Sequence, residues 1–220
     1  QQAVHYARDR VQGQAPGMPG KSAIIHHPDV RRMLMLMRAL SEASRALCYV
    51  TSAAFDHGHK ALDPEVRASA MRRAELLTPI SKAWSTEVSQ EVTSLGVQVH
   101  GGMGFIEETG AAQLMRDARI TTIYEGTTGI QALDLIGRKV IRDQGAALLS
   151  LLEEVDETAV ALATGFPAMA ASLTAASTEF RQATSFVLIH AGDHEHLASA
   201  VTLPRGLWRR TPPCRRRRSP

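Results

Sequence analysis

The stretch ARITTIYEGTT, from Ala118 to Thr128, contains one carboxylate, that of Glu125, among small and β-branched residues. A carboxylate that loses its water in a mostly apolar, non-helical segment becomes a stronger base, suited to proton abstraction. The same residue lies just before an expected helix, where an acid is also favoured as an ordinary capping residue. The residues alone therefore leave two interpretations open, a catalytic base and a capping acid.

A second stretch, QVHGGMGF from Gln98 to Phe105, has three glycines within four residues. Glycine lets the backbone approach a ligand closely and presents N–H groups to an anion. A dinucleotide-binding fingerprint needs a strand before its glycines. A long helix is expected here instead, so we reject a Rossmann interpretation. On spacing alone, the alternative is a helix end followed by a turn.

Histidine and cysteine offer little further chemistry. The pairs His57–His59 and His194–His196 have spacings that a metal could use, but neither has an obvious third ligand nearby. We therefore predict solvent-exposed loop histidines and no metal site. Cys48 and Cys214 lie far apart and outside any CxxC pair, which predicts no disulfide and a reducing, cytoplasmic environment.

The positive charge of the chain is concentrated at its end. Seven arginines and no acids follow Glu195, and removing seven charges from the net +3 leaves −4 for the rest. A nucleic-acid partner would thus depend on this tail alone, and the sequence gives it little support. The Pro- and Arg-rich segment 197–220 has no periodicity and is expected to be disordered.

No apolar run approaches the roughly 18 to 20 residues of a membrane span.

Helices must position both stretches. Aromatic residues make up only 5% of the chain, and unbranched apolar residues are frequent, which favours helix over strand. The sequence Asp63-Pro64-Glu65 is a strong helix start, whereas the segment 56–63 is expected to turn the chain. Apolar spacing and breakers predict an all-α bundle with helices over 1–12, 30–55, 64–99, 109–116, from 127 or 128 onward, 146–164 and 167–191.

Taken together, the motifs between Gln98 and Lys139 resemble the C-terminal signature of the acyl-CoA dehydrogenase family. The likeness consists of the glycine-rich turn, then Arg-Asp-Ala-Arg, then Ile-Tyr-Glu-Gly-Thr, then Ile-Gln, at the family's spacing. The segment YARDRVQG, from Tyr6 to Gly13, is similar to the opening of the family's C-terminal helical domain. The resemblance implies an antiparallel four-helix bundle over 1–144 and an additional helical region over 145–196, as in larger bacterial members.

The resemblance also implies a reaction. Family members use FAD to place a double bond between the α and β carbons of an acyl-CoA thioester. Glu125 stands at the position of the base that removes the α proton, with its backbone N–H as an expected donor to the thioester. Gly126 would let the thioester lie close to the chain. Such a base is expected to be shielded from water at the mouth of a flavin pocket.

Cofactor contacts carry over from the resemblance position by position. Arg10 matches an arginine that contacts FAD phosphates, and the turn formed by Gln98, Val99, His100, Gly101 and Gly102 matches one that holds the FAD of a neighbouring subunit. A homo-oligomer, either a dimer or a tetramer, is therefore expected. Thr127 matches a flavin-side contact, which Thr128 and Gly129 extend. Two positions depart from the family's pattern. Gly129 stands where some members have a glutamine that contacts the flavin, and Gln12 stands where the opening motif often has a phenylalanine that would stack. An electron-transfer flavoprotein or a similar acceptor is the expected redox partner.

The family's N-terminal helical domain and middle β domain have no counterpart here, so we expect the chain to be part of a longer protein. The arginine-rich end resembles nothing in the family, and we favour translation in a shifted frame over a natural tail. A non-catalytic oligomerisation or binding module derived from the family is the alternative to an FAD-dependent oxidoreductase of fatty-acid β-oxidation.

Overall fold

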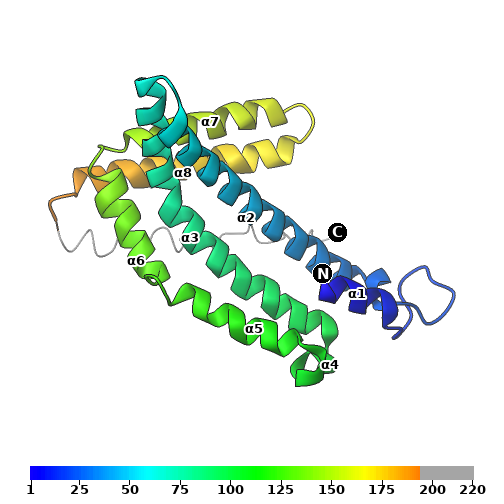
Figure 1. Ribbon diagram of the computed structural model, residues 1–220. Coiled ribbons are helices and arrows are strands. Elements are labelled where there is room, and N and C mark those ends of the chain that lie inside the picture. Colours follow the sequence, from blue (N-terminus) through cyan, green and yellow to red (C-terminus); the bar gives the residue numbers. More distant parts are fainter. Residues whose placement is uncertain (194–220) are drawn as a thin grey trace. The chain divides into compact units, whose positions relative to one another are not determined.

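The computed structural model describes residues 1–193, and their regular secondary structure is helical (Figure 1). Within these residues the only strand-like feature is an isolated antiparallel bridge between Val11 and Ala23. The predicted all-α class is confirmed, while the expectation of disorder for 197–220 lies outside the described residues. The helices are α1 (Gln2–Asp9), η1 (Ile24–His26), α2 (Pro28–Lys60), α3 (Pro64–His100), α4 (Gly102–Phe105), η2 (Glu107–Thr109), α5 (Ala111–Arg119), η3 (Ile120–Thr122), α6 (Thr128–Leu133), η4 (Asp134–Val140), α7 (Ala146–Leu162) and α8 (Pro167–Ile189).

The chain forms two compact units, and the long helices α2 and α3 contribute to both. Unit 1 comprises Gln1–Ala53 and Ser81–Thr128. Ala3 and Ala7, one turn apart on α1, pack with Met33 of α2 and Val99 of α3 in its core. The core of unit 1 therefore fixes α1 against the end of α3, where the glycine-rich turn begins.

Unit 2 comprises Ala54–Ile80 and the chain from Gly129 onward. Its core joins Leu76 of α3 with Leu135 and Val140 of η4, and with Leu148 and Leu152 of α7. Helices α7 and α8 lie side by side as a hairpin (Figure 1). These units differ from the expected division at residue 144, which stays a prediction based on the family resemblance.

The predicted start of α3 is confirmed in detail. The Asp63 carboxylate accepts the backbone N–H of Glu65 at 2.8 Å, and the helix begins at Pro64. The predicted turn over 56–63 is wrong in its first part, because α2 continues to Lys60. Gly58 lies in this helix, where a Cβ would meet Met71 backbone atoms at 3.3 Å. This glycine serves a close helix–helix approach within unit 2, and His57 and His59 are exposed helical residues rather than loop residues.

Two further boundaries differ from expectation. Helix α5 extends to Arg119 and is followed by the 3₁₀ turn η3, so the non-helical connector is shorter than 118–128. After α6 the backbone continues as the π-helix η4, a change that side-chain periodicity does not signal.

Among residues 1–193, none of the helices is both long and apolar enough to cross a membrane.

Candidate functional site

Glu125 lies in a tight turn between η3 and α6, and its backbone is left-handed, with φ of 51°. The turn is built locally, because the N–H groups of Ile123 and Tyr124 both donate to the carbonyl oxygen of Ile120. Gly126 continues it with φ of 90°, which glycine adopts without strain. A left-handed conformation of a non-glycine residue costs about 1–3 kcal/mol and is often found at functional sites.

Lys82 of α3 holds this turn. Its ammonium donates to the Glu125 carbonyl oxygen at 3.2 Å and lies 3.9 Å from the Glu125 carboxylate. Both contacts are within unit 1, so one side chain of α3 is in contact with both the backbone and the acid of the turn. Lys82 is not predictable from the sequence, since a lysine on a long helix carries no signal that points to a residue so distant in the sequence.

The expected shielding of Glu125 is not found within the described chain. Its side chain is 76% exposed, and the neighbouring Tyr124, Gly126 and Thr127 are also exposed. Lys82 contacts this turn from α3, and its contacts leave most of the carboxylate uncovered. Any dry environment for this carboxylate must therefore come from outside unit 1.

The threonines after the turn have different environments. Thr128 is 4% exposed, and its hydroxyl donates to the Glu87 carboxylate of α3 at 3.1 Å. Thr127 is exposed, as a residue in contact with a cofactor would have to be before binding. Gly129 lies in the first turn of α6 and is half-buried. The Thr128 side chain thus anchors the start of α6, and Thr127 is the accessible member of the pair.

Helix α3 also holds the segment before the turn. The Gln90 amide donates to the carbonyl oxygen of Ala118, and the hydroxyls of Ser89 and Thr121 are 3.2 Å apart. These contacts fasten the end of α5 and η3 beside the second half of α3 (Figure 1). They explain why β-branched residues between Ile120 and Thr122 can form a short helix, because side-chain contacts to α3 offset their low propensity.

The glycine-rich turn begins at the end of α3. Gly101 has φ of 59°, and the Gly104 N–H donates to the Gly101 carbonyl oxygen at 2.8 Å. Gly104 is buried, and a Cβ there would lie 2.3 Å from the carbonyl oxygen of Val97, so only glycine fits. At Gly101 and Gly102 a Cβ would meet nothing within 4 Å. One glycine thus serves packing, and two leave backbone accessible.

The five residues assigned to the neighbouring FAD are not equally accessible. Gln98, Gly101 and Gly102 are exposed, whereas Val99 is 4% and His100 is 6% exposed. The His100 ring stacks on Tyr6 with centroids 4.4 Å apart, and its Nδ1 lies 2.7 Å from the Gly96 carbonyl oxygen. Val99 and His100 therefore pack this turn, and the exposed members present the surface that a ligand could reach.

Arg10 is brought to the same end of unit 1. It caps α1 through its N–H, which donates to the Tyr6 carbonyl oxygen, and it is exposed. Its own carbonyl oxygen accepts the N–H of Ile24 at 2.8 Å. Because Tyr6 stacks on His100, the opening motif and the glycine-rich turn form one cluster.

The glycine-rich turn and the Glu125 turn contact α3 at widely separated positions. The first follows His100, and the second is held by Lys82, eighteen residues earlier on α3. At about 1.5 Å of rise per residue, this separation is about 27 Å. The two sites therefore cannot contact the same reacting atom within one chain, and a shared function requires a large ligand or two chains.

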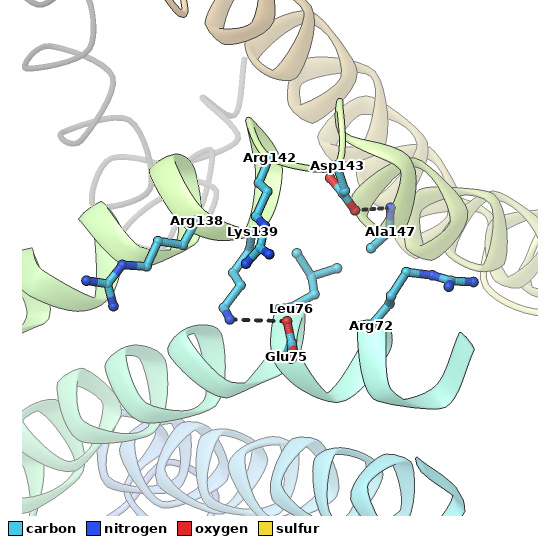
Figure 2. A pocket seen from close by; sticks show the side chains of 8 residues that line it. All are labelled: Arg72, Glu75, Leu76, Arg138, Lys139, Arg142, Asp143 and Ala147. Atoms are coloured by element: carbon cyan, nitrogen blue, oxygen red, sulfur yellow. Dashed lines mark hydrogen bonds and ion pairs between the residues drawn. The ribbon is translucent and has the colours of Figure 1, made fainter. Parts of the chain in front are cut away.

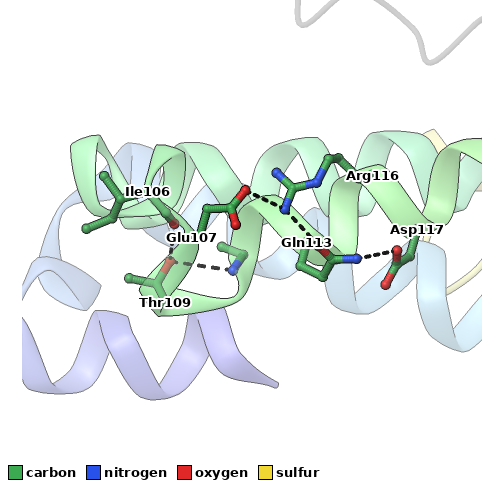
Figure 3. Close-up of polar contacts among 7 residues, drawn as sticks. Ile106, Glu107, Thr109, Gln113, Arg116 and Asp117 are labelled. Atoms are coloured by element: carbon green, nitrogen blue, oxygen red, sulfur yellow. Dashed lines mark hydrogen bonds and ion pairs between the residues drawn. The ribbon is translucent and has the colours of Figure 1, made fainter.

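The Arg-Asp-Ala-Arg motif contributes contacts on α5 (Figure 3). Arg116 pairs with Glu107 of η2 at 2.9 Å and donates to Gln113, whose amide donates to Asp117. The helix expected over 109–116 begins instead at Ala111, after Gly110, and the Thr109 hydroxyl donates to the Met103 carbonyl oxygen at 2.8 Å and lies 3.5 Å from the Ala111 nitrogen. The ion pair between Arg116 and Glu107 thus joins α5 to η2, the turn that follows the glycine-rich segment.

With this geometry in view, residues 1–141 match the family model described as "Acyl-CoA dehydrogenase, C-terminal domain". The match covers more than half of the chain. The chain therefore belongs to the acyl-CoA dehydrogenase family, whose members are FAD-dependent oxidoreductases.

Individual relatives agree with this assignment. The chain is 47% identical over 212 residues to 3-methylmercaptopropionyl-CoA dehydrogenase of Ruegeria pomeroyi, covering 93% of the chain and 35% of the relative. It is 38% identical over 157 residues to a butyryl-CoA dehydrogenase of Syntrophomonas wolfei, covering 70% and 26%. The chain thus spans about a third or less of the length of these relatives.

A solved structure supports the fold. The chain aligns with the structure titled "Bd2924 apo-form" at a TM-score of 0.60 and 22% identity, covering 94% of this chain and 36% of that one. As for metals, residues 1–193 contain no group of three or more His, Cys, Asp or Glu placed to hold an ion.

Proposed function

We propose that this chain is the C-terminal part of an FAD-dependent acyl-CoA dehydrogenase that desaturates acyl-CoA thioesters, with Glu125 as the α-proton base. The observation that carries the proposal is the Tyr124-Glu125-Gly126 turn. Its acid is held in a left-handed conformation and contacted by Lys82, inside the segment that matches the family. A left-handed backbone at a non-glycine residue supports a functional role for this acid.

The residues present fit the flavin that the family uses. Gly101 and Gly102 leave open space where side chains would otherwise stand, and Gln98 and Arg10 are exposed at the same end of unit 1. Exposed backbone without side chains and a guanidinium suit the phosphates of a dinucleotide. When bound, FAD supplies the acceptor for the hydride that leaves the β carbon.

The chain's own part in the reaction is proton abstraction. The Glu125 carboxylate takes the α proton, and the Glu125 N–H donates to the thioester oxygen as negative charge develops on it. Gly126 keeps this approach free of a side chain. Because the carboxylate is 76% exposed in the described residues, we propose that the acyl-CoA and the other domains of the protein exclude water from it.

The test uses a chimera that joins this chain to the part of the Ruegeria pomeroyi relative that it does not cover. Glu125→Gln keeps the shape of the side chain but removes the base, so dehydrogenation with an artificial electron acceptor should fall by a factor of about a hundred or more. Flavin absorbance should stay unchanged. The matched control is Glu108→Gln, an exposed acid of η2, which should retain full turnover. Undiminished turnover in Glu125→Gln would remove this residue from the mechanism.

A second candidate is a non-catalytic oligomerisation or binding module. The exposure of Glu125 favours it, as do exposed apolar side chains on α5 and after it, namely Leu114, Met115, Ile120 and Ile123. If the chimera folds as a colourless protein that cannot be reconstituted with FAD, this reading replaces the enzymatic one. We propose a homo-oligomer in either case, and an electron-transfer flavoprotein or similar acceptor as the partner of the enzyme.

A further inference from the structure

Unit 2 contains an open pocket of about 290 Å³ between α3 and the segment that joins η4 to α7 (Figure 2). None of the residues that line it is among those to which the family resemblance assigns a role. The charged residues that line it are four cationic side chains, Arg72, Arg138, Lys139 and Arg142, and two carboxylates, Glu75 and Asp143.

Both carboxylates are already engaged. The Asp143 oxygens accept the backbone N–H groups of Gly145 at 3.0 Å and Ala147 at 2.9 Å, so this acid caps the start of α7. Glu75 accepts from the Lys139 ammonium at 3.3 Å. Arg72 and Arg142 make no ion pair within residues 1–193, and the pocket carries two positive charges more than negative ones.

The side chains of Lys139 and Arg142 run side by side toward Glu75, and those of Arg72 and Arg138 extend to either side (Figure 2). The Lys139 side chain is largely buried and fixed by its ion pair, whereas Arg72 and Arg142 are exposed. A fixed ammonium thus lies next to an exposed guanidinium at the centre of the pocket lining, with Arg72 at its edge.

We propose that this pocket binds a phosphate group carried by a small organic molecule. Guanidinium groups match phosphoryl oxygens in pairs, and a dianionic phosphate balances the two surplus charges, whereas a single carboxylate balances one. The volume is near the lower end of the 300–1,000 Å³ typical of ligand pockets, which is more than a free phosphate fills. Leu76 and Ala147 supply apolar surface for the organic part.

The site is tested by titrating the full chain with pyrophosphate at about 0.15 M salt and following backbone amide resonances. Shifts are expected at Arg142 and Ala147. Arg142→Gln and Arg72→Gln should each weaken binding about tenfold. Arg31→Gln, an exposed arginine of α2 that loses the same charge, should bind as the unaltered chain does.

Two further titrations distinguish which kind of molecule carries the phosphate. Coenzyme A and its form without the 3′-phosphate are titrated in the same way. Tighter binding of coenzyme A assigns the pocket to that 3′-phosphate, and binding of pyrophosphate alone assigns it to a different phosphorylated metabolite. Affinity that is unchanged in both Arg142→Gln and Arg72→Gln overturns the proposal, since binding would then belong to other arginines such as those of the segment 205–218. An absence of shifts at Arg142 and Ala147 overturns it as well.

Discussion

Gly104 and Gly102 differ in what a side chain would contact at each position. A Cβ at Gly104 would lie 2.3 Å from the Val97 carbonyl oxygen and 2.9 Å from the His100 Cβ, whereas a Cβ at Gly102 would meet nothing within 4 Å. The first contact involves backbone that cannot rotate away. Within one motif, Gly104 is therefore needed for packing, whereas Gly102 leaves the backbone accessible.

We expect Gly104→Ala to lower the free energy of unfolding by about 1–3 kcal/mol, because the end of α3 must shift to admit the methyl group. Gly102→Ala, at the first position of α4, should leave it nearly unchanged. Urea unfolding followed by circular dichroism measures both. Equal stability of the two variants would contradict the packing role of Gly104.

Sequence reasoning identified Glu125 and the glycine-rich turn because their residue types are unusual for their positions. It did not identify Lys82, Glu87 or Gln90, which hold the Glu125 turn and the segments on either side of it from α3. A polar residue on a helix has many possible partners. Which partner it contacts is decided only when α3 packs against the later segments. The family resemblance assigns Val99 and His100 to a cofactor contact by position, and their burial, at 4% and 6% exposed, comes from packing that the motif does not show.

At the scale of elements, local signals predicted boundaries and long-range packing changed them. Asp63 and Pro64 start α3 as expected, since capping and a fixed φ act within one turn. Gly58 did not end α2, because a glycine in a helix can serve close packing instead. The π-helix η4 was also not foreseen, because it depends on how Leu135 and Val140 reach the core of unit 2.

The α7–α8 hairpin contains an acid whose titration affects stability. The side chains of Ser177 and Arg181 hold the pKa of Asp156 below its usual range, and the Arg181 guanidinium donates to the Asp156 carboxylate at 2.7 Å. The unfolded chain therefore binds this proton first as the pH falls. The stabilisation is fully present above about pH 4 and is lost as the pH drops through the lowered pKa.

We expect Asp156→Asn to be less stable than the unaltered chain at neutral pH, with the difference shrinking below about pH 4. Glu153→Gln, an exposed acid on the same helix, serves as the control and should differ little from the unaltered chain throughout. Thermal unfolding at a series of pH values measures both variants. A difference that does not depend on pH would show that Asp156 acts through packing rather than charge.

For the molecule as a whole, the separation of the two sites is the decisive feature. The turn of Glu125 and the exposed glycines of the other turn lie about 27 Å apart along α3. If both take part in catalysis, either one long ligand spans them, or each serves a different active centre and a complete centre needs the turn of a second copy. The second arrangement is the one that the family resemblance implies, whereas the exposure of the Glu125 side chain could not be predicted, since composition does not reveal which neighbours a residue has.

Complementation between subunits tests this organisation and depends on the proposed function. Two chimeras are made inactive separately, one by Glu125→Gln and the other by Gly102→Asp, which places a negative charge where FAD phosphates would lie. In a mixed dimer, one centre combines the intact Glu125 of one copy with the intact glycine-rich turn of its partner. Random pairing in a two-fold dimer therefore restores about a quarter of the unaltered activity. If each turn served its own chain, every centre would keep a defect, and mixing would restore none.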